Sequence, residues 1–430
     1  MLASDYQALS AKTHFAGTHR AVPPAETWAR IQPVLPKVGI TRVADITGLD
    51  CIGIPVCNAI RPDGWSLSVS QGKGITLTNA RVSAAMEAIE LFHAERLETP
   101  QRRRTFKALG PGKAVDPMQL SVLPGCADPR GKGMRWVSGH DLIAGRDVLV
   151  PRDAITCDLR AKSPTDGVLL SSSNGLASGN TTEEAAVHAL CEVIERDATC
   201  LHQAVARFYR AEPCLIDLDT IDDPDCVVLL DRILAAGVFV TCWQQISDLP
   251  VPSFGCAIWD THQSPLPGSP IGTFQGYGCH LDPGIALSRA ITEAVQSRLT
   301  YISGARDDIF RDDYALTMAR RNREAWLDWL LGSRRMMDFR AIASLATDRI
   351  SGDLDRLLAL LPWAGFDRVV LVDLTRPDIG VPVVRAIVPG LVEPDSREAP
   401  PDVPRVRRFV ARHGAEIRLL QDGLGTGGWA

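Results

Sequence analysis

The chain lacks the sequence features that mark several large classes of protein. Its 430 residues carry a net charge of -5, and the absence of a broad basic field argues against duplex nucleic acid as a partner. No uninterrupted apolar run approaches the ~20 residues that a membrane span requires. The first twenty residues also contain no apolar signal core. These absences predict a cytoplasmic protein with no membrane partner.

Familiar metal and nucleotide motifs are missing as well. The eleven cysteines form no CxxC pair and the nine histidines form no HExxH, so the sequence predicts no zinc site. Reduced and mostly buried thiols are the expected state of the cysteines. The pattern GxxxxGK[ST] is absent throughout, so any nucleotide must bind without a P-loop. Nothing in the sequence marks a catalytic residue.

The remaining composition is that of an ordinary folded protein, with 45% apolar and 23% charged residues. Strand-like segments follow residue 40, and helices are predicted over 77–97, 182–208 and 283–303. A Trp/Arg-rich segment over 325–345 is predicted to be helical, and residues 368–389 return to strand patterns. The order of these elements predicts a mixed α/β fold with helices packed on β-sheets.

Three of the predicted helices share one register. The three helices can be aligned on one glutamate each. An alanine stands three residues before this glutamate, and a β-branched apolar residue stands two residues after it. A second oxygen-bearing side chain stands three residues after it. The aligned pairs are Glu87 with Glu90, Glu192 with Glu195, and Glu293 with Gln296, and they recur at intervals of 105 and 101 residues. Side chains at i and i+3 lie on one helical face. Small residues at the alanine positions would let the three helices approach closely.

In the second helix Glu184 joins the pair, because its position lies within ~80° of both on the helical wheel. Carboxylates that converge without histidine or cysteine are typical ligands of Mg²⁺, which is usually shared with phosphates. A solvated helix face would explain one such pair, but three copies in one apolar frame favour a metal and nucleotide site. His188 lies on the same face, where a packing role is the simpler interpretation.

Basic and glycine-rich segments supply candidates for phosphate contacts. Lys73 lies between two glycines directly after a strand, where backbone can approach a phosphate closely. The segment 171–184 leads into a helix N-terminus, with Thr181 and Glu184 at capping-box spacing. Three arginines flank the glutamate rows and could balance phosphate charge, namely Arg196, Arg289 and Arg298.

These segments resemble the YcaO family. The similarity rests on GKGITLTNARVSAAMEAIE, SSNGLASGNTTEEAAVHALCEVIERDA and ALSRAITEAVQSR, in the family's order. It covers residues 40–400, which leaves 1–39 as an N-terminal extension and 401–430 as a C-terminal extension. The resemblance implies a YcaO-type ATP-binding fold without a P-loop, with ATP and Mg²⁺ as cofactors. It also implies phosphorylation of a backbone amide oxygen in a peptide or protein substrate.

The resemblance carries over residue roles at matching positions. The implied metal ligands are Glu87, Glu90, Glu192 and Glu195. The implied nucleotide-binding residues are Lys73, Ser83, Asn180, Glu184, Arg196, Glu293, Gln296 and Arg298. One departure is Leu91, which stands where the family usually has an arginine, so one expected cation is missing.

The end of the chain bears on the product. Azoline-forming members of the family often end in a Pro-rich tail, whereas this chain ends in the Gly-rich GLGTGGWA, expected to be mobile. The resemblance therefore favours members that form thioamides with a TfuA-like partner protein and a sulfur donor. Three alternatives stay open: an azoline-forming cyclodehydratase, a non-catalytic YcaO accessory protein, and a carboxylate-amine ligase of unrelated fold. A homodimer is compatible with the resemblance, and the sequence leaves the oligomeric state open.

Overall fold

The computed structural model describes residues 12–97, 102–123, 125–160, 165–260, 272–317, 320–393 and 403–421. Within these residues the strands form a short hairpin and three larger sheets. The hairpin pairs β1 (Thr13–His14) with β2 (His19–Arg20). The first larger sheet has the order β3–β4–β5, with β3 at Arg42–Asp45, β4 at Val56–Ile60 and β5 at Val69–Lys73.

The two other sheets have five strands each. One has the order β7–β6–β14–β15–β8, built from β6 (Trp136–Asp141), β7 (Arg146–Pro151), β8 (Leu176–Ser178), β14 (Val370–Asp373) and β15 (Val383–Ile387). The other has the order β12–β11–β10–β9–β13, built from β9 (Cys214–Asp217), β10 (Val238–Gln244), β11 (Ser253–Asp260), β12 (Thr273–Cys279) and β13 (Met336–Asp338). Neighbouring strands are antiparallel except β9 and β13.

One edge strand of each sheet leads into a long helix. Three residues connect β5 to α2 (Leu77–Glu95), β8 to α4 (Thr182–Tyr209) and β12 to α6 (Pro283–Ser303). The last connecting residue caps the helix, since Thr76, Thr181 and Asp282 each accept a hydrogen bond from the backbone N–H three residues later. Each cap lies eleven residues before an aligned glutamate, so the register seen in the sequence is also structural.

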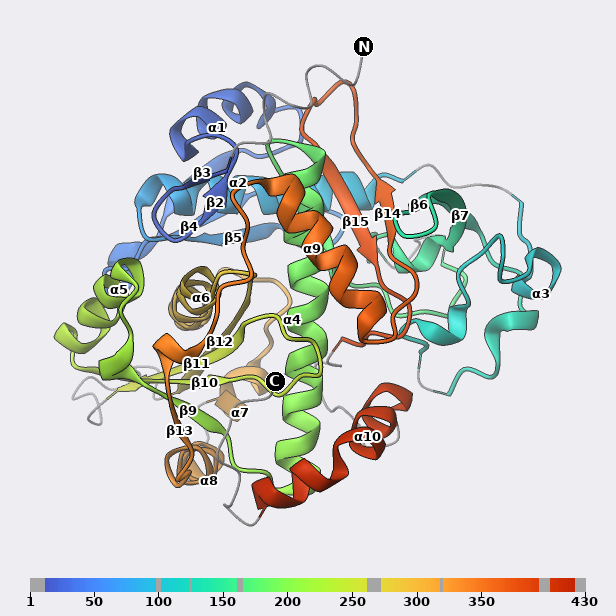
Figure 1. Ribbon diagram of the computed structural model, residues 1–430. Coiled ribbons are helices and arrows are strands. Elements are labelled where there is room, and N and C mark those ends of the chain that lie inside the picture. Colours follow the sequence, from blue (N-terminus) through green and yellow to red (C-terminus); the bar gives the residue numbers. More distant parts are fainter. Residues whose placement is uncertain are drawn as a thin grey trace.

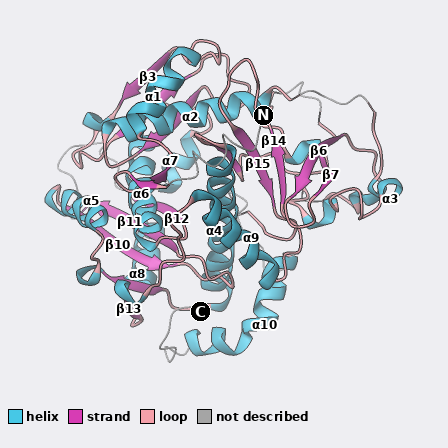
Figure 2. Ribbon diagram, turned by 45° about the horizontal axis from the view of Figure 1, so that its top comes forward, coloured by secondary structure: helices cyan, strands magenta, loops and turns pink. Residues whose placement is uncertain are grey.

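Helix α4 runs through the middle of the molecule, with the sheet of β9–β13 on one side and the sheet of β6, β7, β14 and β15 on the other (Figures 1 and 2). Helix α2 packs on β4 and β5, and α6 packs on β11 and β12. The predicted ranges of these three helices are confirmed within two residues.

The small residues of the shared register bring helices onto strands. A Cβ on Gly72 of β5 would lie 1.9 Å from the backbone nitrogen of Ala84, and one on Gly276 of β12 would lie 2.3 Å from the carbonyl oxygen of Ala290. Only glycine permits such contact between backbones. Ala84 and Ala290 thus let α2 and α6 close onto their own edge strands, a contact that differs from the expected approach of helix to helix. The expected convergence of the glutamates is nevertheless present, since all three helices contribute glutamates to one cavity.

The remaining helices surround this framework. They are α1 (Pro24–Ile31), α3 (Phe106–Leu109), α5 (Pro224–Ala235), α7 (Arg311–Thr317), α8 (Arg320–Leu331), α9 (Ile350–Trp363) and α10 (Pro404–Gln421). The predicted helix over 325–345 is wrong in its second half, since α8 ends at Leu331 and β13 begins five residues later. The Gly-rich tail lies outside the described residues. Among the helices that are described, none has the length and apolarity needed to cross a bilayer. All eleven cysteines are free, and nine of them are buried, which confirms the expectation that most are buried.

Candidate nucleotide and metal site

The three capped helices and their edge strands enclose a cavity of about 650 Å³. Eleven of the twelve sequence-predicted site residues line it. They are Lys73, Ser83, Glu87, Glu90, Asn180, Glu184, Glu192, Glu195, Arg196, Glu293 and Gln296. Because these residues come from segments more than 200 positions apart in the sequence, the fold and not local proximity brings them together.

Burial raises the pKa of four cavity glutamates, those predicted as metal ligands. It raises the pKa of Glu90 to about 8 and that of Glu195 to about 7. For Glu87 and Glu192 burial also raises the pKa, although Arg306 and Arg196 oppose the shift. The neighbouring carboxylates repel one another and add to the effect. A cation placed among these side chains would lower the four pKa values, because it stabilises the charged carboxylates.

Glu293 is the exception among the aligned glutamates. Burial alone would raise its pKa, but the ammonium of Lys73 and the guanidinium of Arg196 hold the pKa below the ordinary value. Lys73 Nζ donates a hydrogen bond to Glu293 Oε2, and the backbone N–H of Tyr277 on β12 donates to Oε1 at 3.4 Å. Gln296 donates to the carbonyl of Gln71 at 3.1 Å and so joins α6 to β5.

The N-terminal segment completes one wall of the cavity, which sequence reasoning missed. The backbone N–H of Ala21 donates to Glu184 Oε2 at 2.8 Å. Thr27 and Arg30 donate to the side-chain oxygen of Asn180 at 2.9 and 2.5 Å. The segment predicted as an extension outside the domain therefore contacts two predicted nucleotide-binding residues. These contacts span about 150 to 163 positions of sequence, and no local pattern signals them.

Arg298, predicted as a nucleotide-binding residue, is not among the residues that line the cavity. Its guanidinium lies 3.0 Å from Asp50 and 3.0 Å from Asp260. The reason is helical geometry. Arg196 follows its aligned glutamate by four residues and returns to within ~40° of it, whereas Arg298 follows Glu293 by five residues and lies ~140° away.

Two cations that the sequence did not single out line the cavity. Arg20 lines the cavity 3.7 Å from Glu184, and Arg306 lines it near Glu87. Arg289, noted in the sequence as a flanking arginine, lines it too. His188 lies among these cations, where burial and the charges of Arg289 and Arg20 hold its pKa well below the ordinary value. The imidazole is therefore neutral at physiological pH.

The donor set fits a magnesium–nucleotide complex. Carboxylate oxygens are the protein ligands that Mg²⁺ prefers, and the cavity supplies them without histidine nitrogen or sulfur among the predicted ligands. Lysine and arginine side chains in the same lining suit phosphate oxygens. The volume lies within the ~300–1,000 Å³ of typical ligand sites.

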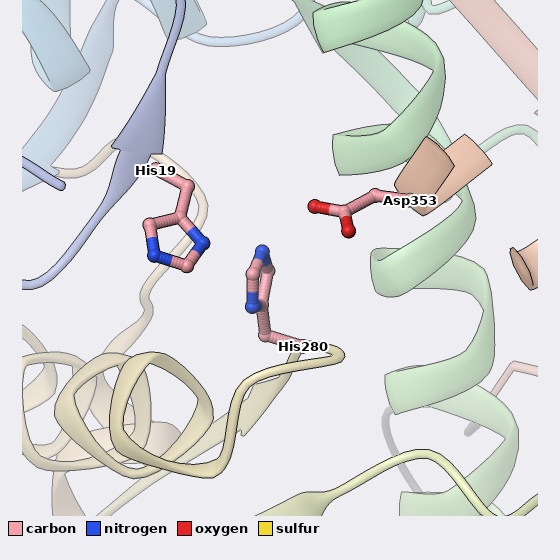
Figure 3. Close-up of side chains that lie close together, drawn as sticks. All are labelled: His19, His280 and Asp353. Atoms are coloured by element: carbon pink, nitrogen blue, oxygen red, sulfur yellow. The ribbon is translucent and has the colours of Figure 1, made fainter. Parts of the chain in front are cut away.

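A second group of potential metal ligands lies apart from these glutamates. Figure 3 shows His19, His280 and Asp353 pointing toward one another, with ligand atoms within 4.8 Å. Both Asp353 oxygens are already engaged, one by Lys12 Nζ at 2.7 Å and the other by the backbone N–H of Thr347 at 2.7 Å. His280 Nδ1 accepts the backbone N–H of Asp282 at 3.0 Å, so its Nε2 carries the proton and offers no lone pair. This group anchors the N-terminal segment and does not suit a metal ion.

The chain is similar in sequence to one protein family and to several individual proteins. The family model described as "YcaO cyclodehydratase, ATP-ad Mg2+-binding" matches residues 71–392. An uncharacterized protein of Methanothermobacter thermautotrophicus is 39% identical over 380 residues, which cover 86% of this chain and 94% of the relative. A protein of Rhizobium leguminosarum bv. trifolii, named for its place in the tfuA 3′ region, is 38% identical over 386 residues, which cover 86% and 88%.

Solved structures share the fold. YcaO from Methanopyrus kandleri, bound with AMPPCP and Mg²⁺, has a TM-score of 0.71 at 23% identity, with 91% of this chain and 100% of that chain covered. A heterocyclase in complex with substrate and cofactor has a TM-score of 0.73 at 23% identity, with 90% of this chain and 55% of that chain covered.

Proposed function

The chain belongs to the YcaO family, and from this premise we propose that it uses Mg-ATP to phosphorylate a backbone amide oxygen in a peptide or protein substrate. The family is described as binding ATP and Mg²⁺, and both are assigned here as cofactors. We propose further that the activated amide becomes a thioamide. The eleven free thiols support a reducing cytoplasm as the compartment.

One observation carries the proposal. A single cavity presents four glutamates with raised pKa values together with lysine and arginine side chains. Buried like charges destabilise a protein unless a ligand compensates them, so their retention in one cavity supports a catalytic site over a non-catalytic accessory role.

The side chains of the cavity would bind Mg-ATP, orient it and neutralise its negative charge. When bound, Mg-ATP supplies the phosphoryl group that turns an amide oxygen into a leaving group. Glu87, Glu90, Glu192 and Glu195 are the proposed metal ligands. The negative charge on the phosphates would be offset by Lys73 and Arg196, the two cations that lie beside Glu293 in the ligand-free protein. Ser178 orients Glu90 through its backbone N–H and its hydroxyl, at 2.8 and 2.6 Å.

Thioamide formation needs an external nucleophile, whereas an azoline uses a side chain already on the substrate. The relative named for the tfuA region supports a TfuA-like partner protein that helps deliver sulfur. The azoline-forming reaction is the second candidate, favoured by the description of the family as cyclodehydratases. Both candidates use the same cavity and differ in the nucleophile.

Mass spectrometry of peptides co-expressed with the chain and its genomic neighbours separates these candidates. A thioamide replaces one oxygen by sulfur, and an azoline loses one water. We expect the sulfur-for-oxygen product, dependent on added sulfide or a sulfur-carrying partner, and no product with the Glu192→Gln variant. Dehydration of a cysteine-containing peptide with ATP alone would overturn the thioamide assignment, and an unmodified peptide pool would overturn both.

A further inference from the structure

A second cavity of about 50 Å³ lies against one wall of the nucleotide cavity. The wall is one residue thick at two places. Ser172 and Asn174 line the small cavity while Ser173 between them lines the large one, and Val193 lines the small cavity while Glu192 lines the large one. Ser173 is exposed, so this wall ends at the protein surface.

A buried arginine without an ion pair faces the small cavity. Arg385 on β15 is 3% exposed, and its Nη1 donates to the carbonyl oxygen of Ser172 at 2.7 Å. Its Nε is buried and has no hydrogen-bond partner in the described part of the chain, nor does any carboxylate there lie within ion-pair distance of Arg385. Buried charges and polar atoms in native proteins are nearly always satisfied.

The same cavity holds an unsatisfied acceptor. The side-chain oxygen of Asn174 is buried and has no partner among the residues that the structure covers. Glu393 also lines the cavity and accepts a hydrogen bond from Ser172 Oγ at 2.7 Å. The lining therefore carries one negative side chain, Glu393, and one positive side chain, Arg385, so an anion would gain little there. The cavity suits a small neutral group that both accepts and donates one hydrogen bond.

We propose that this cavity binds a backbone amide of the peptide substrate, close in sequence to the amide that is activated. Its carbonyl accepts from Arg385 Nε and its N–H donates to Asn174 Oδ1. A peptide crossing the thin wall beside Ser173 then has one backbone amide in each cavity. This inference rests on the proposed function for the identity of the ligand, and the site itself rests on the unsatisfied donor and acceptor.

The first test does not require turnover. Crystals of the full chain are soaked with N-methylacetamide, and matched soaks use N,N-dimethylacetamide, which has no N–H, and acetate, which is an anion. We expect N-methylacetamide to bind between Arg385 and Asn174 and the other two to be excluded. Water molecules alone in the cavity, or equal occupancy by acetate, would overturn the proposal.

The second test uses the modified peptide. Asn174→Leu fills the cavity and removes the acceptor, so the KM for the peptide should rise about tenfold, the size of one lost hydrogen bond. Asn174→Asp keeps an acceptor oxygen and should retain the wild-type KM. The Mg-ATP dissociation constant should be the same in all three proteins. An unchanged KM in Asn174→Leu sinks the subsite while peptide modification stands, and an unmodified peptide with a positive soak sinks only the proposed function.

Discussion

Binding of Mg-ATP should release protons, because metal-ligating carboxylates must be deprotonated. Burial raises the pKa of Glu90 to about 8 and that of Glu195 to about 7 in the ligand-free protein. At pH 7.5 these values leave ~75% of Glu90 and ~25% of Glu195 side chains protonated, so these two ligands together should release ~1 proton on binding. Glu87 and Glu192 add to the release, since burial raises their pKa values too. At pH 9 the same values predict release of only ~0.1 proton.

Isothermal titration calorimetry in two buffers of different ionisation enthalpy measures this release directly. Parallel titrations with ATP in the absence of Mg²⁺ isolate the metal-dependent part. Glu90→Gln should lower the release at pH 7.5 by ~0.75 proton, the share of Glu90, whereas Glu416→Gln on the exposed face of α10 should leave it unchanged. Equal proton release without Mg²⁺, or release that does not fall by pH 9, would refute the metal-ligand assignment.

Three further outcomes follow from the same geometry. Glu87→Gln and Glu192→Gln should each abolish turnover while the melting temperature holds or rises slightly, because each removes one of several crowded charges; an unfolded variant would mean a structural role. Arg298→Met should lower the free energy of unfolding by about 3 kcal/mol, because it leaves Asp50 buried without its partner. Calorimetry should give this variant the wild-type Mg-ATP affinity, and a weakened affinity would instead support the predicted nucleotide-binding role of Arg298. The ligand-free protein should lose stability as pH rises from about 4.5 to 8, since the folded state of Glu90 holds its proton there and the unfolded state does not. Denaturant midpoints across this range should fall less in Glu90→Gln than in the wild type, and parallel curves would contradict the raised pKa.

The sequence predicted the three helices and most of the cavity because one physical pattern marks both. Carboxylates at i and i+3 among small and apolar residues identify a helix face that is polar and yet turned toward the interior, as Glu87 and Glu192 show by lining the cavity. The same helical geometry would also have excluded Arg298, whose spacing from Glu293 turns it away from the cavity. Motif matching alone overlooked that difference of one residue.

Other site residues were beyond prediction because no periodicity relates them to the glutamates. Arg20 precedes the first helix of the threefold register, and Arg306 follows the last. Their approach to Glu184 and Glu87 depends on how the connecting segments fold back over the cavity. Pairings across such sequence separations are decided by tertiary packing, which a single sequence does not reveal.

The third helix shows how the repeated register was modified locally. Gly74 and Gly179 stand thirteen residues before their aligned glutamates, and His280 takes that position before Glu293. A Cβ on Gly74 would lie 2.4 Å from the Cβ of Asn79, and one on Gly179 would lie 2.6 Å from the backbone nitrogen of Ala185, so glycine lets the chain pack tightly against the start of the helix. The imidazole of His280 instead packs on His19, with the ring centroids 5.5 Å apart. His280 thereby holds the N-terminal segment whose Ala21 N–H engages Glu184. Two copies of the connection thus let the strand end lie tightly against the start of its helix, and the third fixes the segment that forms the cavity wall.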